Sequence, residues 1–218
     1  SVNRFEAFIR LYVEVFQRNN VSGTVSFYGL GSPGTSYLLL KRLQELLPGV
    51  TITGETETTI FDRAYATKDT NELIQIRDVA ARTNRVMAET VDFLKSHRAR
   101  ANRLIRGNGS PLTIGEVRQF INRRLMEQGL EASEGIIFAM GRDGGVPHSR
   151  GEDDQVLETG RAIVFDLFPR QIGGGYFHDM TRTFSLGYAT PEVEHAYRQV
   201  MQAFDAVVND LSAGERGE

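Results

Sequence analysis

Two apolar runs near the C-terminal end of the chain, residues 161–168 and 175–186, are each interrupted by a single aspartate. The first run, RAIVFDLF, contains Asp166, and the second, GYFHDMTRTFSL, contains Asp179. Apolar, β-branched and aromatic residues on either side of a Gly-rich connection predict two neighbouring strands. A carboxylate inside a strand is unfavourable unless it is paired, hydrogen-bonded or bound to a metal ion. Both strands therefore need a sheet that brings a partner to each aspartate.

The side chains of a strand repeat every second residue, so a hairpin of these two strands can bring Asp166 and Asp179 to one face of a sheet. Two facing carboxylates repel each other, and a divalent cation between them relieves that repulsion. A structural role is the alternative, in which Asp166 pairs with Arg170 or Arg182 or caps a turn. The residues alone leave both interpretations open.

The first part of the chain has a simple order of elements. Helical periodicity over residues 4–18 and 37–47 alternates with strand-like runs at 24–29 and 50–54. This order predicts a small α/β segment, to which we assign residues 1–65.

A second part, residues 66–218, begins with two helices that carry capping-box sequences, Asp69 to Glu72 and Thr113 to Glu116. A strand at 136–140, the two aspartate strands and a last helix from Thr190 to Leu211 follow. Because helices and strands are grouped rather than alternating, the fold class is α+β.

The composition excludes several classes of site. The net charge is −3, and the densest basic stretch, residues 95–106, is typical of a solvated helix end, so we expect no nucleic-acid partner. The chain has no cysteine, which excludes disulfides, thiolate metal ligands and a cysteine nucleophile. With no apolar run of roughly 18 residues and no signal-peptide pattern, we predict a cytoplasmic protein without a membrane partner.

Three linked segments resemble one family of enzymes. They are residues 141–148 (GRDGGVPH), which end at His148, residues 164–170 (VFDLFPR) and residues 175–184 (GYFHDMTRTF). In order and spacing they resemble the metallopeptidases of the pita-bread fold, which include Xaa-Pro aminopeptidase, prolidase and creatinase. The DLFPR variant, with Asp179 placed 13 residues after Asp166, is similar to the Xaa-Pro peptidase branch.

The resemblance implies a function. Asp166 and Asp179 would bind two divalent ions (manganese, cobalt, zinc or iron), and a water bridging the ions would attack the peptide bond before a proline. His148 would contact the substrate and stabilise the tetrahedral intermediate. The substrate would be a peptide with proline at its second position. Residues 1–65 would be part of a creatinase-like N-terminal domain, and residues 66–218 the first half of an incomplete pita-bread catalytic domain.

The chain departs from the family pattern after Asp179. The pattern requires a later histidine and two glutamates, whereas the only later histidine is His195, in a predicted helix. We therefore expect a fragment that binds metal weakly if at all, has no activity by itself, and forms homo-oligomers through the uncovered faces of the half domain. A creatinase-like hydrolase of a small amide and a non-catalytic binding module remain as alternatives.

Overall fold

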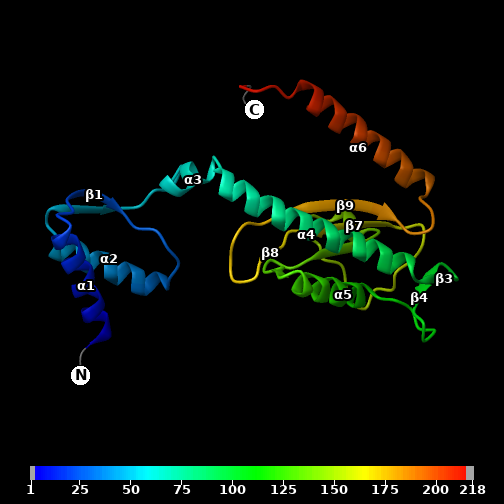
Figure 1. Ribbon diagram of the computed structural model, residues 1–218, viewed down its shortest axis with the longest axis horizontal. Helices are drawn as coiled ribbons and strands as arrows, with labels where there is room; N and C mark the ends of the chain where they lie inside the picture. The colour runs from blue at the N-terminus through cyan, green and yellow to red at the C-terminus, as the bar shows by residue number, and fades with distance from the viewer. Residues whose placement is uncertain (1–2, 215–218) are drawn as a thin grey trace. The chain divides into compact units, whose positions relative to one another are not determined.

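The structure is a computed structural model that describes residues 3–214, and the chain divides into two compact units after Lys68 (Figure 1). The first unit contains α1 (Arg4–Arg18), β1 (Gly23–Ser26), α2 (Pro33–Leu46), β2 (Val50–Thr53) and α3 (Ile60–Tyr65). Strands β1 and β2 pair in parallel. Its small core consists of Ile9, Phe16, Leu43, Leu47 and Val50.

The second unit is the larger one. It contains α4 (Thr70–Lys95), β3 (Arg98–Arg100), β4 (Arg103–Ile105), α5 (Ile114–Glu127), β5 (Leu130–Glu131), β6 (Ile137–Met140), η1 (Asp143–Gly145), β7 (Ala162–Leu167), β8 (Arg170–Gln171), β9 (Met180–Ser185) and α6 (Pro191–Asp210). None of the helices within residues 3–214 is long and apolar enough to cross a membrane.

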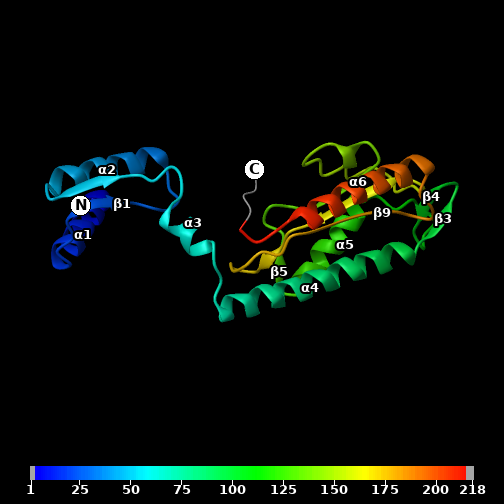
Figure 2. The same cartoon turned by 90° about the horizontal axis from the view of Figure 1, so that it is seen from above.

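The main sheet of this unit has the strand order β6–β7–β9, and both pairings are antiparallel. Along β7 the side chains of Ile163, Phe165 and Leu167 are fully buried and alternate with half-buried ones. The buried set belongs to one core with Val86 of α4 and Ile121 of α5. Figure 2 shows α4 and α5 on the same side of the sheet. The half-buried side chains of β7 therefore lie on the opposite face.

Both predicted capping boxes are confirmed. Asp69 caps α4, with its side chain accepting the Glu72 amide while the Glu72 side chain accepts the Asp69 amide. Thr113 and Glu116 form the same reciprocal pair at the start of α5. These pairs satisfy backbone donors that a helix start leaves free, so the beginnings of both helices are fixed by local sequence.

Two local predictions were wrong. The basic stretch predicted as a solvated helix end contains the hairpin β3–β4, because Ala101 and Asn102 both adopt positive φ and close a two-residue turn. The last predicted strand begins at Met180 rather than at residue 175, so Asp179 precedes β9 instead of lying within it. A Gly-rich segment with positive φ at Gly173, Gly174 and Gly175 leads into this strand, and that conformation does not fit a regular strand.

One ion pair links α4 to α5 within the second unit. The Arg124 Nε donates to Glu89 Oε2 at 2.8 Å, and the two side chains are about equally shielded, 31% and 27% exposed. The hydrogen bond from Arg124 lowers the pKa of Glu89 below its ordinary value, against a smaller opposing effect of desolvation. Arg124 also pairs with the more exposed Glu127 on its own helix.

This pair predicts a pH-dependent stability. A carboxylate whose pKa is lower in the folded than in the unfolded chain stabilises the fold above its unfolded pKa and loses that contribution as the pH falls through the folded pKa. Glu89→Gln should therefore lower the free energy of unfolding at pH 7 by up to about 1 kcal/mol and have a smaller effect in acid. Denaturant unfolding at a series of pH values measures this. Glu127→Gln is the matched control, and an equal effect of both variants would contradict the prediction.

Candidate active site

Asp166 lies near the end of β7, on the face of the sheet opposite α4 and α5. It is half-buried, and it directly faces Thr181 of β9 in the antiparallel register. The Thr181 hydroxyl donates a hydrogen bond to Asp166 Oδ1 at 2.6 Å. Because an ionised carboxylate can only accept hydrogen bonds, this contact fixes one of its oxygens and leaves the other available.

Asp179 lies beside Asp166. It lies two residues before Thr181, so in an extended chain its side chain is on the same side as that of Thr181, and this side chain is exposed. Partial desolvation, the negative charge of Asp166 and a hydrogen bond shared with Asp166 raise the pKa of Asp179, and the nearby His178 and the Met180 amide oppose the shift. The two carboxylates thus lie next to each other on one face of the sheet. Binding of a proton or a cation there would reduce their repulsion.

Neither arginine of the structural alternative pairs with Asp166. Arg170 pairs with Glu131, with Nε and Oε1 2.9 Å apart, and its guanidinium lies over the ring of Phe177. Arg182 donates from Nη1 to the backbone carbonyl of Thr181 at 2.7 Å. Neither arginine forms an ion pair with either aspartate within residues 3–214. The aspartates therefore carry their charges without a guanidinium partner.

His148 reaches this face from the loop 141–151. Its φ is 61°, in the left-handed region that a residue with a side chain seldom adopts. Two glycines let the loop lie against the sheet. A Cβ on Gly144 would approach Val164 Cγ2 to 3.3 Å, and one on Gly151 would be 2.8 Å from the Phe138 carbonyl oxygen. The loop conformation thus depends on glycine, which has no side chain, at both positions.

A cavity of about 410 Å³ collects these groups. Seven residues line it, namely Glu134, Ile137, His148, Arg150, Asp166, Phe168 and Asp179. All three residues singled out from the sequence are among them, from two strand ends and one loop. The sequence alone did not identify Glu134, Arg150 or the supporting Thr181. Their positions in the cavity depend on the strand register and on the path of the loop, and a short sequence motif predicts neither of these.

The other histidines lie elsewhere. His178 is half-buried, and its amide donates to the Pro169 carbonyl. His97 lies two residues beyond the end of α4, with Nδ1 2.7 Å from the Phe93 carbonyl oxygen. His195 is exposed on α6. Within the described part of the chain, no three His, Asp or Glu side chains are grouped so as to hold a metal ion.

Comparison with known proteins identifies the family. Residues 74–218 match the model of metallopeptidase family M24. The chain belongs to this family. The matched region contains the loop of His148 and both aspartates, so the predicted family resemblance is confirmed.

Curated relatives point to the same group. The probable dipeptidase PepE of Mycobacterium tuberculosis and that of Mycobacterium bovis are each 26% identical to this chain over 161 residues. These alignments cover 74% of this chain but only 39% of each relative. The chain therefore spans well under half the length of the curated relatives it matches.

Solved structures confirm the fold. The Xaa-Pro dipeptidase of Bacillus anthracis superposes with a TM-score of 0.72 at 20% identity, covering 95% of this chain and 52% of that one. The X-Pro aminopeptidase of Thermotoga maritima gives a TM-score of 0.64 at 21% identity, covering 91% and 50%. The predicted mixed α and β fold, with about half of the pita-bread architecture, is thus confirmed.

Proposed function

We propose that this chain supplies the first half of the catalytic domain of a dinuclear-metal Xaa-Pro peptidase. The observation that carries the proposal is the shared cavity, in which Asp166 and Asp179 lie beside each other within reach of His148. A cavity with two unpaired carboxylates and a histidine is a suitable place for metal-assisted hydrolysis. The proline-specific relatives named above support a substrate with proline at its second position.

The residues present fit part of a metal centre. Two adjacent carboxylates offer the oxygen ligands that manganese accepts well, and their mutual repulsion favours a cation between them. Each divalent ion needs four or more ligands, which two aspartates do not provide. We therefore propose that further ligands come from residues beyond Asp179, in a part of the protein that the relatives have and that this chain does not cover. Without those ligands, the 218-residue chain should not turn over substrate.

The chain's own residues have separate tasks in this proposal. Asp166 and Asp179 would hold the ions, and the ions when bound would supply a water acidic enough to attack a carbonyl carbon at neutral pH. The hydroxyl of Thr181 holds one oxygen of Asp166 and so orients that carboxylate. His148 donates a hydrogen bond to the substrate oxygen on which negative charge develops.

The first test measures hydrolysis of Ala-Pro with added manganese. A form of the protein that continues beyond Glu218 should be active, and the 218-residue chain should not. In the longer form, Asp166→Asn or Asp179→Asn should lower kcat/KM about 1000-fold or more, since several kcal/mol of transition-state stabilisation would be lost. His148→Ala should lower kcat about 100-fold through the loss of one hydrogen-bond donor.

His148→Asn is a useful companion variant, because asparagine tolerates a positive φ and so keeps the loop conformation. A longer form that hydrolyses no Xaa-Pro peptide with any divalent metal would refute the proposed reaction. Hydrolysis of a small amide such as creatine would instead favour the creatinase-like alternative.

The second test concerns the support of Asp166. Thr181→Val removes the hydroxyl but keeps the side-chain shape, and it should weaken manganese binding by the longer form about 10- to 100-fold. Thr183→Val is the matched control, because Thr183 has the same parity on β9 and faces Val164 rather than Asp166. Isothermal titration calorimetry measures both affinities. Equal effects of the two variants would show that Thr181 does not orient a ligand.

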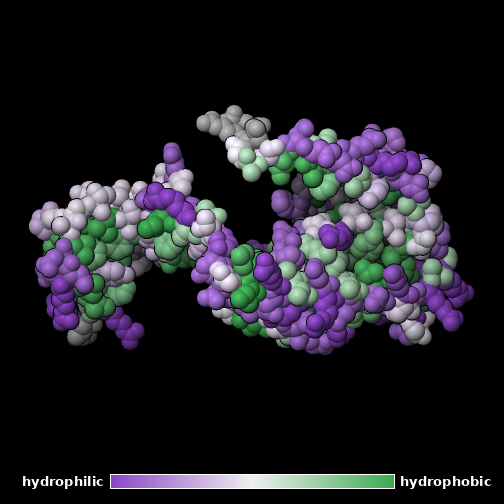
Figure 3. All heavy atoms as spheres, turned by 45° about the horizontal axis from the view of Figure 1, so that its top comes forward, coloured by the Kyte–Doolittle hydropathy of each residue, from purple (hydrophilic) through white to green (hydrophobic). Residues whose placement is uncertain are grey.

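We also propose that the 218-residue chain self-associates through α6. Apolar residues follow this helix at alternating intervals of four and three, as in a two-helix seam, and most are exposed, with Phe204 59% and Leu211 78% exposed. The members of this stripe are Val193, Tyr197, Val200, Phe204 and Val207 of α6 and Leu211, which directly follows the helix. In Figure 3 some apolar (green) atoms reach the surface near the C-terminal end of α6, among polar ones. An uncovered stripe of this kind favours association.

Light scattering coupled to size exclusion checks this proposal. The chain should elute as a dimer or larger species, and Phe204→Asp should shift it toward the monomer because a charge would be buried in the seam. Gln202→Asp places the same charge off the stripe and should leave the mass unchanged. A monomeric wild-type chain over a wide range of concentration would contradict the proposal.

A further inference from the structure

The loop 141–151 has to hold His148 in a strained backbone conformation. Its φ of 61° costs free energy in a residue with a side chain, so it persists only where the chain on both sides is held firmly. Before His148, the Gly141 amide donates to the Ala162 carbonyl oxygen at 2.8 Å and so attaches the start of the loop to β7. The part of the loop that follows His148 needs an anchor of its own.

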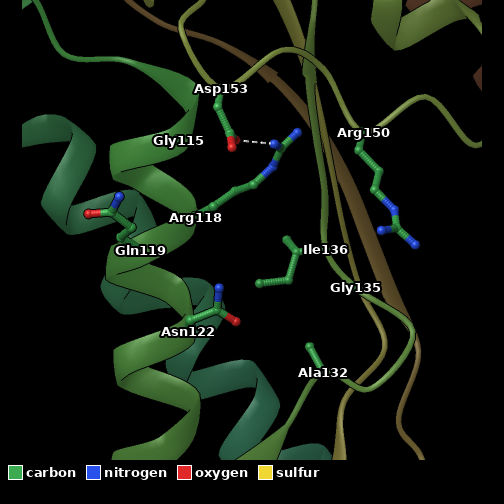
Figure 4. A pocket seen from close by; sticks show the side chains of 9 residues that line it. All are labelled: Gly115, Arg118, Gln119, Asn122, Ala132, Gly135, Ile136, Arg150 and Asp153. Carbon is green, nitrogen blue, oxygen red and sulfur yellow. Dashed lines mark hydrogen bonds and ion pairs between the residues drawn. The ribbon is translucent and has the colours of Figure 1, made fainter.

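That anchor lies on α5. The Arg118 Nη2 donates to the Gly151 carbonyl oxygen at 2.7 Å, and its Nη1 pairs with Asp153. Figure 4 shows Arg118 extending from α5 toward Asp153, with a dashed line that marks this contact. The Gly115 amide also donates to the Asp153 carbonyl oxygen at 2.9 Å. A Cβ on Gly115 would be 2.9 Å from the same oxygen, so the lack of a side chain there lets the chain lie this close to the helix.

The bond to the Gly151 carbonyl is the more important of the two contacts of Arg118. The Arg118 side chain is 16% exposed, whereas that of Asp153 is 75% exposed. An ion pair with so exposed a carboxylate contributes little, because water screens it. The Arg118 Nε is buried without a hydrogen-bond partner in the described part of the chain, which is a cost of placing the side chain there. We therefore attribute the position of Arg118 chiefly to its bond with Gly151.

Gly151 passes this constraint on to His148. The two residues are three apart, and three residues span at most about 11 Å. Between them, the Ser149 amide donates to the Val146 carbonyl oxygen at 3.1 Å and closes a turn around His148. The Gly151 amide lies 3.4 Å from the Ser149 hydroxyl oxygen, which accepts its hydrogen bond. A shift of the Gly151 carbonyl would therefore move the turn that carries the imidazole.

Arg118 lines a cavity other than that of the aspartates. This cavity has a volume of about 330 Å³ and lies between α5 and the segment 132–136 (Figure 4). Arg118 is not among the residues that line the cavity of Asp166 and Asp179. Any influence of Arg118 on the proposed reaction must therefore pass through the loop.

We propose that Arg118 is a positioning residue for His148. Its bond to the Gly151 carbonyl holds the loop so that the imidazole reaches the cavity of Asp166 and Asp179. This inference rests on the proposed function, in which His148 donates a hydrogen bond to the substrate oxygen, and it assigns to a side chain of α5 the task of keeping that donor in place. Arg118 itself touches neither the substrate nor a metal ion in this scheme.

Hydrogen exchange in the 218-residue chain tests the anchor without any catalysis. Arg118→Met keeps an apolar side chain but removes the donors, and it should speed up exchange of the amides of residues 144–151 about 10-fold or more, because a charge-assisted hydrogen bond no longer holds the loop. Asn122→Met is the matched control. Asn122 lines the same cavity one turn further along α5, and within residues 3–214 it forms no hydrogen bond with the loop. Unchanged exchange in Arg118→Met would overturn the inference.

Kinetics with Ala-Pro test the consequence for catalysis in the form of the protein that continues beyond Glu218. Arg118→Met should lower kcat about 10-fold, since a small displacement of a catalytic group is enough for such a loss. KM and the manganese affinity, measured by isothermal titration calorimetry, should stay within about twofold, because the contacts with substrate and metal are not removed. Arg118→Lys should recover part of the rate, because lysine can still donate to the Gly151 carbonyl. Asp153→Asn should cost less than Arg118→Met, because the ion pair is exposed.

A double variant separates this role from a general effect on the fold. When His148 is already replaced in His148→Ala, Arg118→Met should lower kcat no further, because its influence passes through the imidazole. A second loss of about 10-fold in that background would overturn the inference and leave the proposed function intact. A longer wild-type form that neither binds manganese nor hydrolyses Ala-Pro would instead overturn the proposed function, and the role of Arg118 with it.

Discussion

The packing of one face of β7 against α4 and α5 determines where the candidate active site lies. Ile163, Phe165 and Leu167 are fully buried, and each such side chain contributes about 1.5–3 kcal/mol of hydrophobic stabilisation relative to exposure. Because successive residues of a strand point to opposite faces, burying these three forces Asp166 to the other face. The stability of the core thus sets the face on which the carboxylate lies, and the hydrogen bond from Thr181 orients it there.

Much of the fold follows from local signals in the sequence. The capping boxes that begin at Asp69 and Thr113 define the starts of α4 and α5, and the apolar runs give the strand that carries Asp166 and the strand that follows Asp179. The errors arose where the backbone conformation is unusual. Ala101 and Asn102 close a hairpin with positive φ, and neither residue type predicts a positive φ as strongly as glycine would.

The candidate site was predictable only in part. Asp166 and Asp179 stand out because a charge inside an apolar run is unexpected in any sequence. His148 stood out only through its motif, since an isolated loop histidine is usually just solvated. Thr181 and Arg150 carry no such signal, because threonine is common in strands and arginine is common in loops. Their positions depend on strand pairing and on a loop path that the contacts of Gly144 and Gly151 make possible.

The pairing of Asp166 with Thr181 has a consequence for how such a site can change. If β9 slipped by one residue against β7, either Met180 or Arg182 would face Asp166 in place of Thr181. The first slip would set a thioether beside the carboxylate, and the second would set a guanidinium there and form an ion pair. The same two strands, with the same sequence, would then make an ordinary structural contact. A one-residue shift in strand alignment toward Arg182 thus separates a surface suited to a cation from one on which Asp166 is already neutralised.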